Sequence, residues 1–444
     1  MKKFFCFIAA AVTVLSFYIK GFALDFVNPN IGFEPKCRSV LLVNLDTDAI
    51  IYEKNATERL PMASLTKIMT AILTIENIEK LSEKENTKIK IRDEILKSLY
   101  GTGSSLSNIK AGEEYTILQL LHCLLVTSGN DAALVLADFI GKGSITNFVD
   151  MMNKKAKELN CNDTHFTNPH GLDSENHYTT AKDLSIIQKH AASLPFYTDI
   201  TATVTSKILG DRKPFLVTTN FMIDKNRGGK YYYKYAKSGK TGFDSKAGKC
   251  LISVANNGRY SYICVILGGF SDDISENIAM LESKALYEWA FNNLEMRKIA
   301  SKDVPVGEVK LNLAWGKKNL LLSTVNDYYA MLPKDIMTSS INCKLNIPDY
   351  VNAPISVGQN IGTATFSYAN SVVATVDLVS KDIAKRSNIL FIMYLLKAIF
   401  TSFWFKLIAG LILAIFSLYI MLFIKQNKYK KRRKRRTPFR KVRF

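Results

Sequence analysis

Three short motifs place a serine or a lysine beside partners that suit serine acyl transfer. In chain order they are Ser64-Leu-Thr-Lys67, Ser128-Gly-Asn130 and Lys240-Thr241-Gly242. Each motif is weak by itself, because an unrelated Ser-x-x-Lys also occurs at Ser107 and Lys110. All three together form a signature of enzymes in which a lysine serves a serine nucleophile. The set therefore predicts an active site.

Ser64 and Lys67 have the spacing of a nucleophile and its base. A helix is predicted over 64–76, and its first turn carries free backbone N–H groups and a dipole that favour developing negative charge. Lys67 lies on the same helical face and can reach the Ser64 hydroxyl. A lysine accepts a proton only if burial or a nearby cation lowers its pKa. Lys240 is the candidate cation.

The other two motifs suit proton transfer and substrate binding. Ser128, at a predicted break between two helices, can pass a proton onward, and Asn130 can orient Lys67 and the substrate amide. Lys240 and Thr241, on a predicted strand, suit a terminal carboxylate. Gly242 leaves room for substrate to lie beside that strand.

The segments around these motifs resemble the low-molecular-mass penicillin-binding proteins of the D-alanyl-D-alanine carboxypeptidase family. The resemblance covers roughly residues 35–380. Its matching segments are Pro61–Thr70, Ser128–Ala133, Phe166–Asp173 and Lys237–Phe243, with a looser match at Ala353–Ile355 and Gly358-Gln359.

This resemblance implies a penicillin-recognising α/β (α+β) fold, as in β-lactamases and transpeptidases, with a small all-β domain after it. It implies a Ser64 acyl-enzyme, Lys67 as proton acceptor, Ser128 as second active-site serine and Lys240 as a substrate-binding residue. The N–H groups of Ser64 and Phe243 would form the oxyanion hole. The implied substrate is a peptidoglycan stem peptide ending in D-Ala-D-Ala, β-lactams are the implied inhibitors, and no metal or cofactor is expected.

Hydrophobic patterning predicts that strands stand at both ends of residues 25–299, the expected catalytic domain, with helices between and after them. That arrangement favours an antiparallel sheet backed by helices. Asn130 or Asp131 is expected to cap the second helix after the break. Strands are predicted at 39–44, 230–254 and 259–269, the last two joined by a turn at 256–258, and helices at 64–76, 116–126, 131–140, 148–159 and 273–299.

Residues 304–382 alternate apolar and polar side chains and predict a small β domain. Turns are expected at Gly316–Asn319 and at Ala369–Ser371, where the second turn separates strands over 363–368 and 372–379. The domain lacks chemically suggestive motifs, so catalysis is assigned to the domain before it.

The charge is concentrated at the two ends of the chain. The last twenty residues, Lys425 to Phe444, hold 12 Lys or Arg and no acid. Without these and three lysines near the N-terminus, the formal charge of +20 falls to +5. The basicity therefore does not indicate a nucleic-acid face. Residues 1–23 have the basic start, apolar stretch and small-x-small site of a signal peptide, with an uncleaved membrane helix as the alternative.

Residues 407–424 are uncharged and almost wholly apolar, and as a helix they span about 27 Å, close to a hydrocarbon core. The basic residues 425–444 then supply a positive-inside signal. We expect an exported enzyme anchored in the cell membrane at 388–424, in contact with lipid, with a cytoplasmic tail. Residues 388–406 either lengthen the span or lie along the outer interface.

The seven cysteines show no CxxC pair and no zinc spacing. Cys6 lies in the predicted signal peptide. Cys123 and Cys264 sit inside apolar runs, which favours buried free thiols over disulfides.

Rival functions lack their necessary residues. A class A β-lactamase needs a glutamate two residues before Glu158-Leu159-Asn160, and Ala156 stands there. A membrane β-lactam sensor would need cytoplasmic machinery beyond a twenty-residue tail. A zinc peptidase built on His165, His170 and His177 fits no usual zinc spacing.

Overall fold

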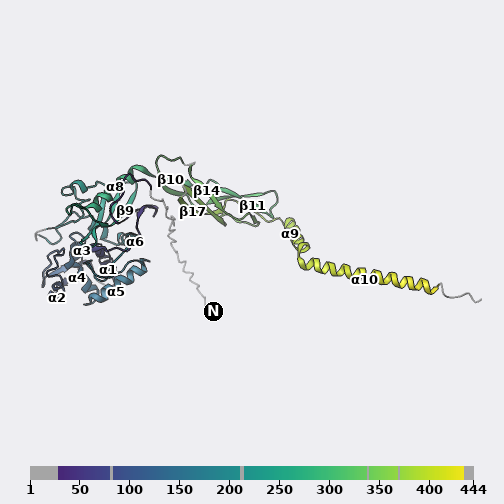
Figure 1. The fold of residues 1–444 in the computed structure, drawn as a ribbon, viewed down its shortest axis with the longest axis horizontal. Helices are drawn as coiled ribbons and strands as arrows, with labels where there is room; N and C mark the ends of the chain where they lie inside the picture. The colour runs from purple at the N-terminus through teal and green to yellow at the C-terminus, as the bar shows by residue number, and fades with distance from the viewer. Residues whose placement is uncertain (1–28, 81–83, 211–214, 338–339, 369–370, 435–444) are drawn as a thin grey trace, which may run out of the picture. The chain divides into compact units, whose positions relative to one another are not determined.

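The computed structural model describes residues 29–80, 84–210, 215–337, 340–368 and 371–434 (Figure 1). The predicted signal peptide, Cys6, residues 435–444 of the basic tail and the first two residues of the turn predicted at 369–371 lie outside the described residues. The chain divides into two compact units, the second of which begins at Ala300; the first also takes in 328–344 and 365–375.

The first unit is built on an antiparallel sheet of five strands in the order β2-β1-β9-β8-β7. These strands are β1 (Ser39–Asn44), β2 (Ile50–Lys54), β7 (Ala236–Asp244), β8 (Gly248–Asn256) and β9 (Ser261–Gly269). Strands β8 and β9 form the predicted hairpin, with Gly258 at φ +90° in its turn. Strand β7, which carries the Lys-Thr-Gly motif, lies at one edge of the sheet, so one side of its backbone is not paired with another strand.

The central strands of this sheet are mostly apolar and are buried on both sides, so both faces of the sheet must be covered. Leu41 and Val265 face the large buried cluster that contains the central helices. Alternate residues face α8 (Ile278–Asn293), where the Tyr287 hydroxyl donates to the Ser253 carbonyl over 2.6 Å. Figure 1 shows α8 on one side of β9 and helices α1, α3 and α4 on the other.

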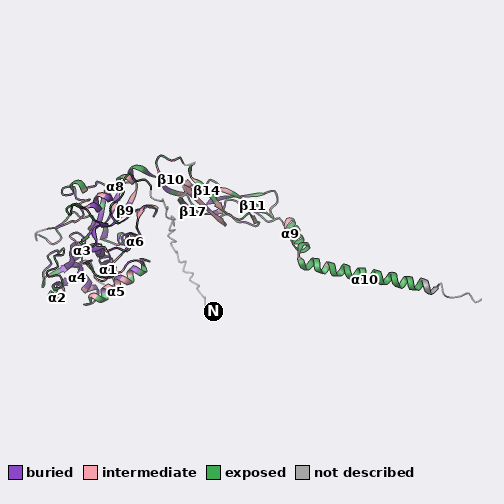
Figure 2. Cartoon of the chain, viewed as in Figure 1, coloured by how far each residue is buried: buried purple, intermediate pink, exposed green. Residues whose placement is uncertain are grey.

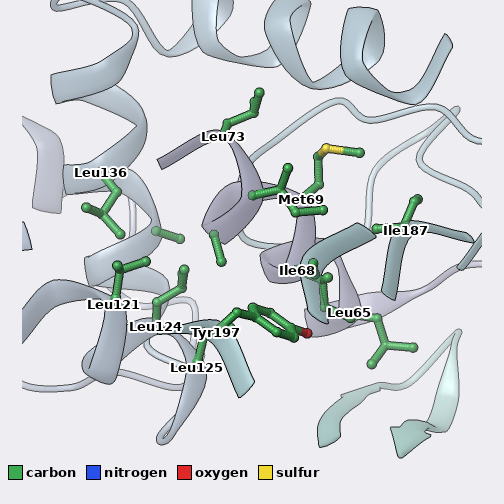
Figure 3. Close-up of a cluster of buried hydrophobic side chains, with 14 of the residues drawn as sticks. Leu65, Ile68, Met69, Leu73, Leu121, Leu124, Leu125, Leu136, Ile187 and Tyr197 are labelled. Carbon is green, nitrogen blue, oxygen red and sulfur yellow. The ribbon is translucent and has the colours of Figure 1, made fainter. Parts of the chain in front are cut away.

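The central helix is α1 (Lys67–Lys80), which follows the short 3-10 helix η1 (Ala63–Thr66). Its apolar side chains pack against α3, α4, α6 and α7, and this packing fixes where the first turn of α1 points (Figure 3). The other helices of this unit are α2 (Asp93–Lys97), α3 (Ile117–Leu125), α4 (Asn130–Ile140), α5 (Ile145–Glu158), α6 (Ala181–Ala192), α7 (Tyr197–Thr201) and the 3-10 helix η2 (Gly229–Tyr231). Two small pairs, β3 (Lys88–Lys90) with β4 (Glu114–Thr116) and β5 (Thr205–Ser206) with β6 (Leu216–Val217), lie outside the main sheet.

The structure corrects several predicted boundaries. The strand predicted over 230–254 is two strands, β7 and β8, because Asp244 accepts the N–H groups of Lys246 and Ala247 and closes a turn there. The helix predicted over 273–299 covers only 278–293. The residues after it form β10 (Leu294–Ala300), which pairs with the distant β13 (Tyr328–Pro333). The cap of α4 is Gly129, so neither Asn130 nor Asp131 caps it.

The C-terminal β region has a sheet of six strands in the order β14-β16-β17-β12-β11-β15. Its strands are β11 (Gly307–Asn312), β12 (Asn319–Thr324), β14 (Asn342–Asn346), β15 (Tyr350–Asn352), β16 (Asn360–Tyr368) and β17 (Ser371–Ser380). The predicted turn at Gly316 joins β11 to β12, and the strands predicted over 363–368 and 372–379 lie within β16 and β17. An all-β domain therefore follows the α/β domain.

Two apolar helices end the described chain, α9 (Asn388–Thr401) and α10 (Phe403–Lys434). The extended backbone of Ser402 (φ −62°, ψ 137°) separates them. Figure 2 shows both helices exposed along their length, in contrast to the buried sheet. Among the described helices, α10 has by itself the length and apolar composition to cross a membrane, over Phe403–Lys430. The predicted span at 407–424 lies inside that segment.

Candidate active site

Ser64 lies in η1, one turn before α1, in a backbone that its surroundings hold in a strained shape. Ala63 has φ +45°, a left-handed conformation that costs a non-glycine residue on the order of 1–3 kcal/mol. The Thr66 hydroxyl donates to the Ala63 carbonyl over 2.8 Å and also contacts His177 Nε2 at 2.7 Å. A Cβ on Gly171 would come within 2.0 Å of the Ala63 oxygen, so only glycine fits against this turn.

Lys67 begins α1 and its side chain is completely buried. Its Nζ lies 2.7 Å from Ser64 Oγ and 2.7 Å from the carbonyl oxygen of His170. Burial first, and the charge of Lys240 second, hold the pKa of Lys67 well below its usual range, while Asp131 acts in the opposite direction. A buried amine with a lowered pKa can accept a proton from the hydroxyl that it touches.

Ser128 lies in the break between α3 and α4, again in a left-handed conformation, with φ +64°. The break is fixed because the Gly129 N–H donates to Cys123 and the Asn130 N–H donates to Ser105. Asn130 is buried at the start of α4, and its Oδ1 has no hydrogen-bond partner within the described part of the chain. An acceptor buried without a partner is costly, which suits a position that a ligand N–H fills.

Lys240 and its neighbours lie on the edge strand β7. Lys240 Nζ donates to Ser128 Oγ over 2.8 Å and to the Thr241 carbonyl over 2.9 Å, and burial lowers its pKa to about 7. A Cβ on Gly242 would lie 2.8 Å from the Met62 carbonyl oxygen. Gly242 therefore lets β7 approach the Ser64 turn itself, which modifies the expectation that it makes room for substrate.

These residues meet at one cleft of about 450 Å³. Six of the eight predicted residues line the cleft directly. The other two, Lys67 and Lys240, lie beneath it and are hydrogen-bonded to Ser64 and Ser128 respectively. The lining residues are Ser64, Thr102, Gly103, Ser104, Ser105, Ser128, Asn130, His170, Gly171, Leu172, Thr219, Thr241, Gly242, Phe243, Asp244, Lys249 and Asn277. The side chain of Phe243 is 56% exposed at the rim, with Lys249 Nζ 3.8 Å from its ring centroid.

Three features of the site escape sequence reasoning. The partner of Lys67 is a main-chain carbonyl of His170, and no hydrogen bond joins Lys67 to Asn130 among the described residues, contrary to the expectation for Asn130. The Thr219 hydroxyl lies 2.5 Å from that of Thr241. Residues 102–105 form one wall of the cleft. For the carbonyl of His170, the sequence signal was the Asn-Pro-His-Gly segment, which contains that residue.

The residues that imitate site motifs have structural roles. The Ser107 N–H and hydroxyl are bonded to Asp131 and to the Cys123 carbonyl, which tie its segment to α4 and α3. Glu158 pairs with Lys155 at 3.1 Å at the end of α5 and does not line the cleft. Burial lowers the pKa of His170 to about 3 and that of His177 to about 4, so both are neutral at neutral pH.

All six described cysteines are free, and Cys123 and Cys264 are buried as predicted.

The fold and the cleft define a serine acyl-transfer enzyme of the penicillin-recognising class, because one serine contacts a buried lysine and a second serine across the cleft contacts another. The family model for D-alanyl-D-alanine carboxypeptidase matches residues 28–271, and the model for the C-terminal domain of penicillin-binding protein 5 matches residues 294–386. The chain belongs to the D-alanyl-D-alanine carboxypeptidase family.

Individual relatives agree with this assignment. The D-alanyl-D-alanine carboxypeptidase DacF of Bacillus subtilis is 30% identical over 395 residues, which are 87% of this chain and 96% of that protein. The DacD enzyme of Escherichia coli is 29% identical over 363 residues, covering 79% and 89%. The structure of penicillin-binding protein 5 from Haemophilus influenzae matches 81% of this chain and all of that one, with a TM-score of 0.63 and 25% identity. The predicted fold class and serine peptidase activity are therefore confirmed, and these matches favour them over a β-lactamase.

Proposed function

We propose that this enzyme removes the terminal D-Ala from peptidoglycan stem peptides through an acyl-enzyme on Ser64. The observation that carries the assignment is the 2.7 Å contact between Ser64 Oγ and the completely buried Nζ of Lys67. A neutral lysine in that position accepts the hydroxyl proton as Ser64 Oγ attacks the carbonyl carbon of the penultimate D-Ala. The first product is a tetrahedral oxyanion.

The oxyanion is assigned to the backbone N–H groups of Ser64 and Phe243. Their approach depends on Gly242, because a side chain there would push β7 away from the Ser64 turn. Fixed N–H donors stabilise the oxyanion more strongly than the neutral carbonyl that precedes it. The strained Ala63 serves the same end, since it turns Ser64 toward the strand.

Collapse of this intermediate releases D-Ala, whose amine must receive a proton. Ser128 is assigned this transfer: its hydroxyl gives the amine a proton and takes in its place the proton that Lys67 accepted from Ser64, which leaves Lys67 neutral again. Lys240 keeps its own proton and holds Ser128 Oγ over 2.8 Å. Lys240 and Thr241 bind the carboxylate of the departing D-Ala, with Thr219 holding the Thr241 hydroxyl. The unpartnered Oδ1 of Asn130 accepts a substrate amide N–H.

Water then hydrolyses the acyl-enzyme, with Lys67 as the base that takes its proton. A β-lactam carbonyl is attacked by Ser64 in the same way, and ring opening leaves the inhibitor attached to the serine. None of the described residues that line the cleft is a glutamate able to activate water, as a class A β-lactamase requires, and this supports the carboxypeptidase assignment.

The proposed location is the outer face of the cell membrane. The apolar part of α10, up to Ile424, is assigned as a single span and the basic residues 425–444 as a cytoplasmic tail, by the positive-inside rule. Lipid is thus a partner of the C-terminal helices. The catalytic and β domains then act on the wall outside.

The activity is tested by mass spectrometry of stem peptides incubated with the full-length enzyme in detergent. Pentapeptides should lose one alanine, and Ser64→Ala should convert none of them. Conversion by the Ser64→Ala variant, or cleavage at another bond only, would overturn the proposal.

The topology is tested separately with spheroplasts. Added protease should digest residues 25–380 and spare an epitope placed after Lys425. An epitope that the protease removes from intact spheroplasts contradicts the assigned orientation.

A further inference from the structure

The end of the β region from which α9 leaves carries an exposed apolar tip. Trp315, in the turn between β11 and β12, is 74% exposed, and Ile383, in the segment after β17, is 61% exposed. Large apolar side chains that lie open on a folded domain commonly mark a contact surface. We define the tip as residues 313–318 together with 381–387.

The two halves of the tip are joined to each other and to the start of α9. The Ser387 N–H donates to the Leu313 carbonyl over 2.7 Å, and Lys317 Nζ contacts Asp382 at 2.7 Å. Ser387 is also the cap of α9, where its hydroxyl accepts the Leu390 N–H. The Trp315 turn is therefore fixed directly beside the first residue of the helix.

Helix α9 exposes a long run of apolar side chains that another phase must cover, because none of its residues is buried in the structure and, between its ends, Lys397 is its only charged residue. With 14 residues it is about 21 Å long, too short to cross a hydrocarbon core of about 30 Å. Whether α9 lies along the membrane surface or dips into it ahead of α10, its cap at Ser387 stays at the level of the lipid headgroups.

We propose that the tip docks on the outer surface of the membrane, with Trp315 and Ile383 inserted at the interface. This inference rests on the proposed anchoring by α10. Trp is enriched at membrane–water interfaces, where its ring is apolar and its N–H meets water. The tip contains five cations and one acid, and that acid is paired with Lys317. The excess positive charge favours anionic headgroups.

The consequence is an oriented domain. Contact through α9 alone would leave the β region free to rotate about the helix axis, whereas a second contact at Trp315 fixes its angle to the bilayer. Insertion of the turn and of α9 together makes two contacts from one rigid, hydrogen-bonded unit, so the second contact costs little additional ordering.

The chain has three tryptophans, Trp289, Trp315 and Trp404, which permits a direct test. Full-length variants that keep one tryptophan each, the other two being changed to Phe, are reconstituted in vesicles of phosphatidylcholine and phosphatidylglycerol. Lipids brominated on the upper part of the acyl chain quench tryptophans that enter the interface. Trp315 should lose emission as Trp404 of α10 does, while Trp289 of α8 keeps its emission.

The outcomes test the docking of the tip and the anchoring by α10 separately. Quenching of Trp404 without quenching of Trp315 overturns the docking and leaves the anchoring intact. Absence of quenching at both positions overturns both. A blue-shifted Trp315 that bromine does not quench shows that a protein surface, such as a second copy, covers the tip. Equal quenching of Trp289 shows a nonspecific effect and also contradicts the proposal.

Discussion

Lys240→Ala tests whether this lysine binds the substrate carboxylate or only helps to lower the pKa of the catalytic base, Lys67. Lys240 is completely buried, so the lost contact is a charge-assisted hydrogen bond shielded from water. Such a bond contributes about 1.5–3 kcal/mol, which is roughly 10- to 150-fold in rate. We therefore expect kcat/KM for a D-Ala-D-Ala peptide to fall by at least about that factor.

Some of this loss is common to every substrate. Removing Lys240 leaves Ser128 Oγ without its donor and removes one cause of the lowered pKa of Lys67. Burial, however, is the largest cause of that lowering, so Lys67 remains a base in the variant. The common loss should therefore be smaller than the loss that depends on the carboxylate.

The assay compares the same peptide with a free and with an amidated C-terminus. The amide should already be a poor substrate for the unaltered enzyme and should lose much less on Lys240→Ala. The difference between the two losses isolates the carboxylate contact, as in a double-mutant cycle. Lys237→Ala is the matched control, because Lys237 is exposed on the same strand. It should change kcat/KM by about twofold at most.

Equal losses on the two substrates would refute the assignment. They would show that Lys240 acts only through Ser128 and Lys67 and that the carboxylate binds elsewhere in the cleft.

Three further outcomes follow from the site. A fluorescent penicillin should label the unaltered enzyme and Ser107→Ala but not Ser64→Ala, as read by gel fluorescence and peptide mapping; label on Ser64→Ala would contradict the nucleophile assignment. The value of kcat/KM should fall as pH rises through about 7. Burial lowers the pKa of Lys240 to about 7, and only protonated Lys240 binds the carboxylate as a cation. The alkaline fall in kcat should lie at higher pH, since bound carboxylate raises that pKa; coincident limbs in the two pH profiles would speak against the contact. Gly171→Ala and Gly143→Ala both place alanine at positive φ (+91° and +86°), so thermal melts should show that each variant loses on the order of 1–2 kcal/mol of stability. Only Gly171→Ala also produces a clash with the Ser64 turn. Only Gly171→Ala should therefore slow acylation in stopped-flow penicillin binding, and equal acylation rates would show that this turn tolerates displacement.

The side chains of the three motifs come together at one cleft, and this proximity could be predicted because each motif combines residue types with a local geometry. Ser64 and Lys67 are one helical turn apart, and that spacing alone brings their side chains together. The contact between Lys240 and Ser128 spans 112 positions. The sequence predicted Lys240 as the cation that helps to lower the pKa of Lys67, and it did not predict that Lys240 also donates a hydrogen bond to Ser128.

What could not be predicted lacks a residue-type signal. The carbonyl of His170 that holds Lys67 is a main-chain group, which any residue could supply. The strand β10 has helix-compatible spacing and becomes a strand because a distant partner, β13, pairs with it. The turn after Asp244, by contrast, did carry a signal that the prediction of one continuous strand passed over, because Asp244, Ser245 and Gly248 are residue types typical of turns.

Ala63 and Ser128, which lie beside the cleft, both have a strained left-handed backbone, and this strain explains why the chain around the two serines is tightly packed. Ala63 and Ser128 each adopt a φ that favours glycine, and such strain persists only where neighbouring contacts fix it. Glycine at either position would relieve the strain, but it would enlarge the conformational freedom lost on folding, and at Ser128 it would delete the hydroxyl. The Thr66–His177 contact and the close approach of Gly171 fix the first turn, and the bonds of the residues after Ser128 fix the second. Stability is thus given up at two points so that both hydroxyls face one cleft, each supported by its own lysine.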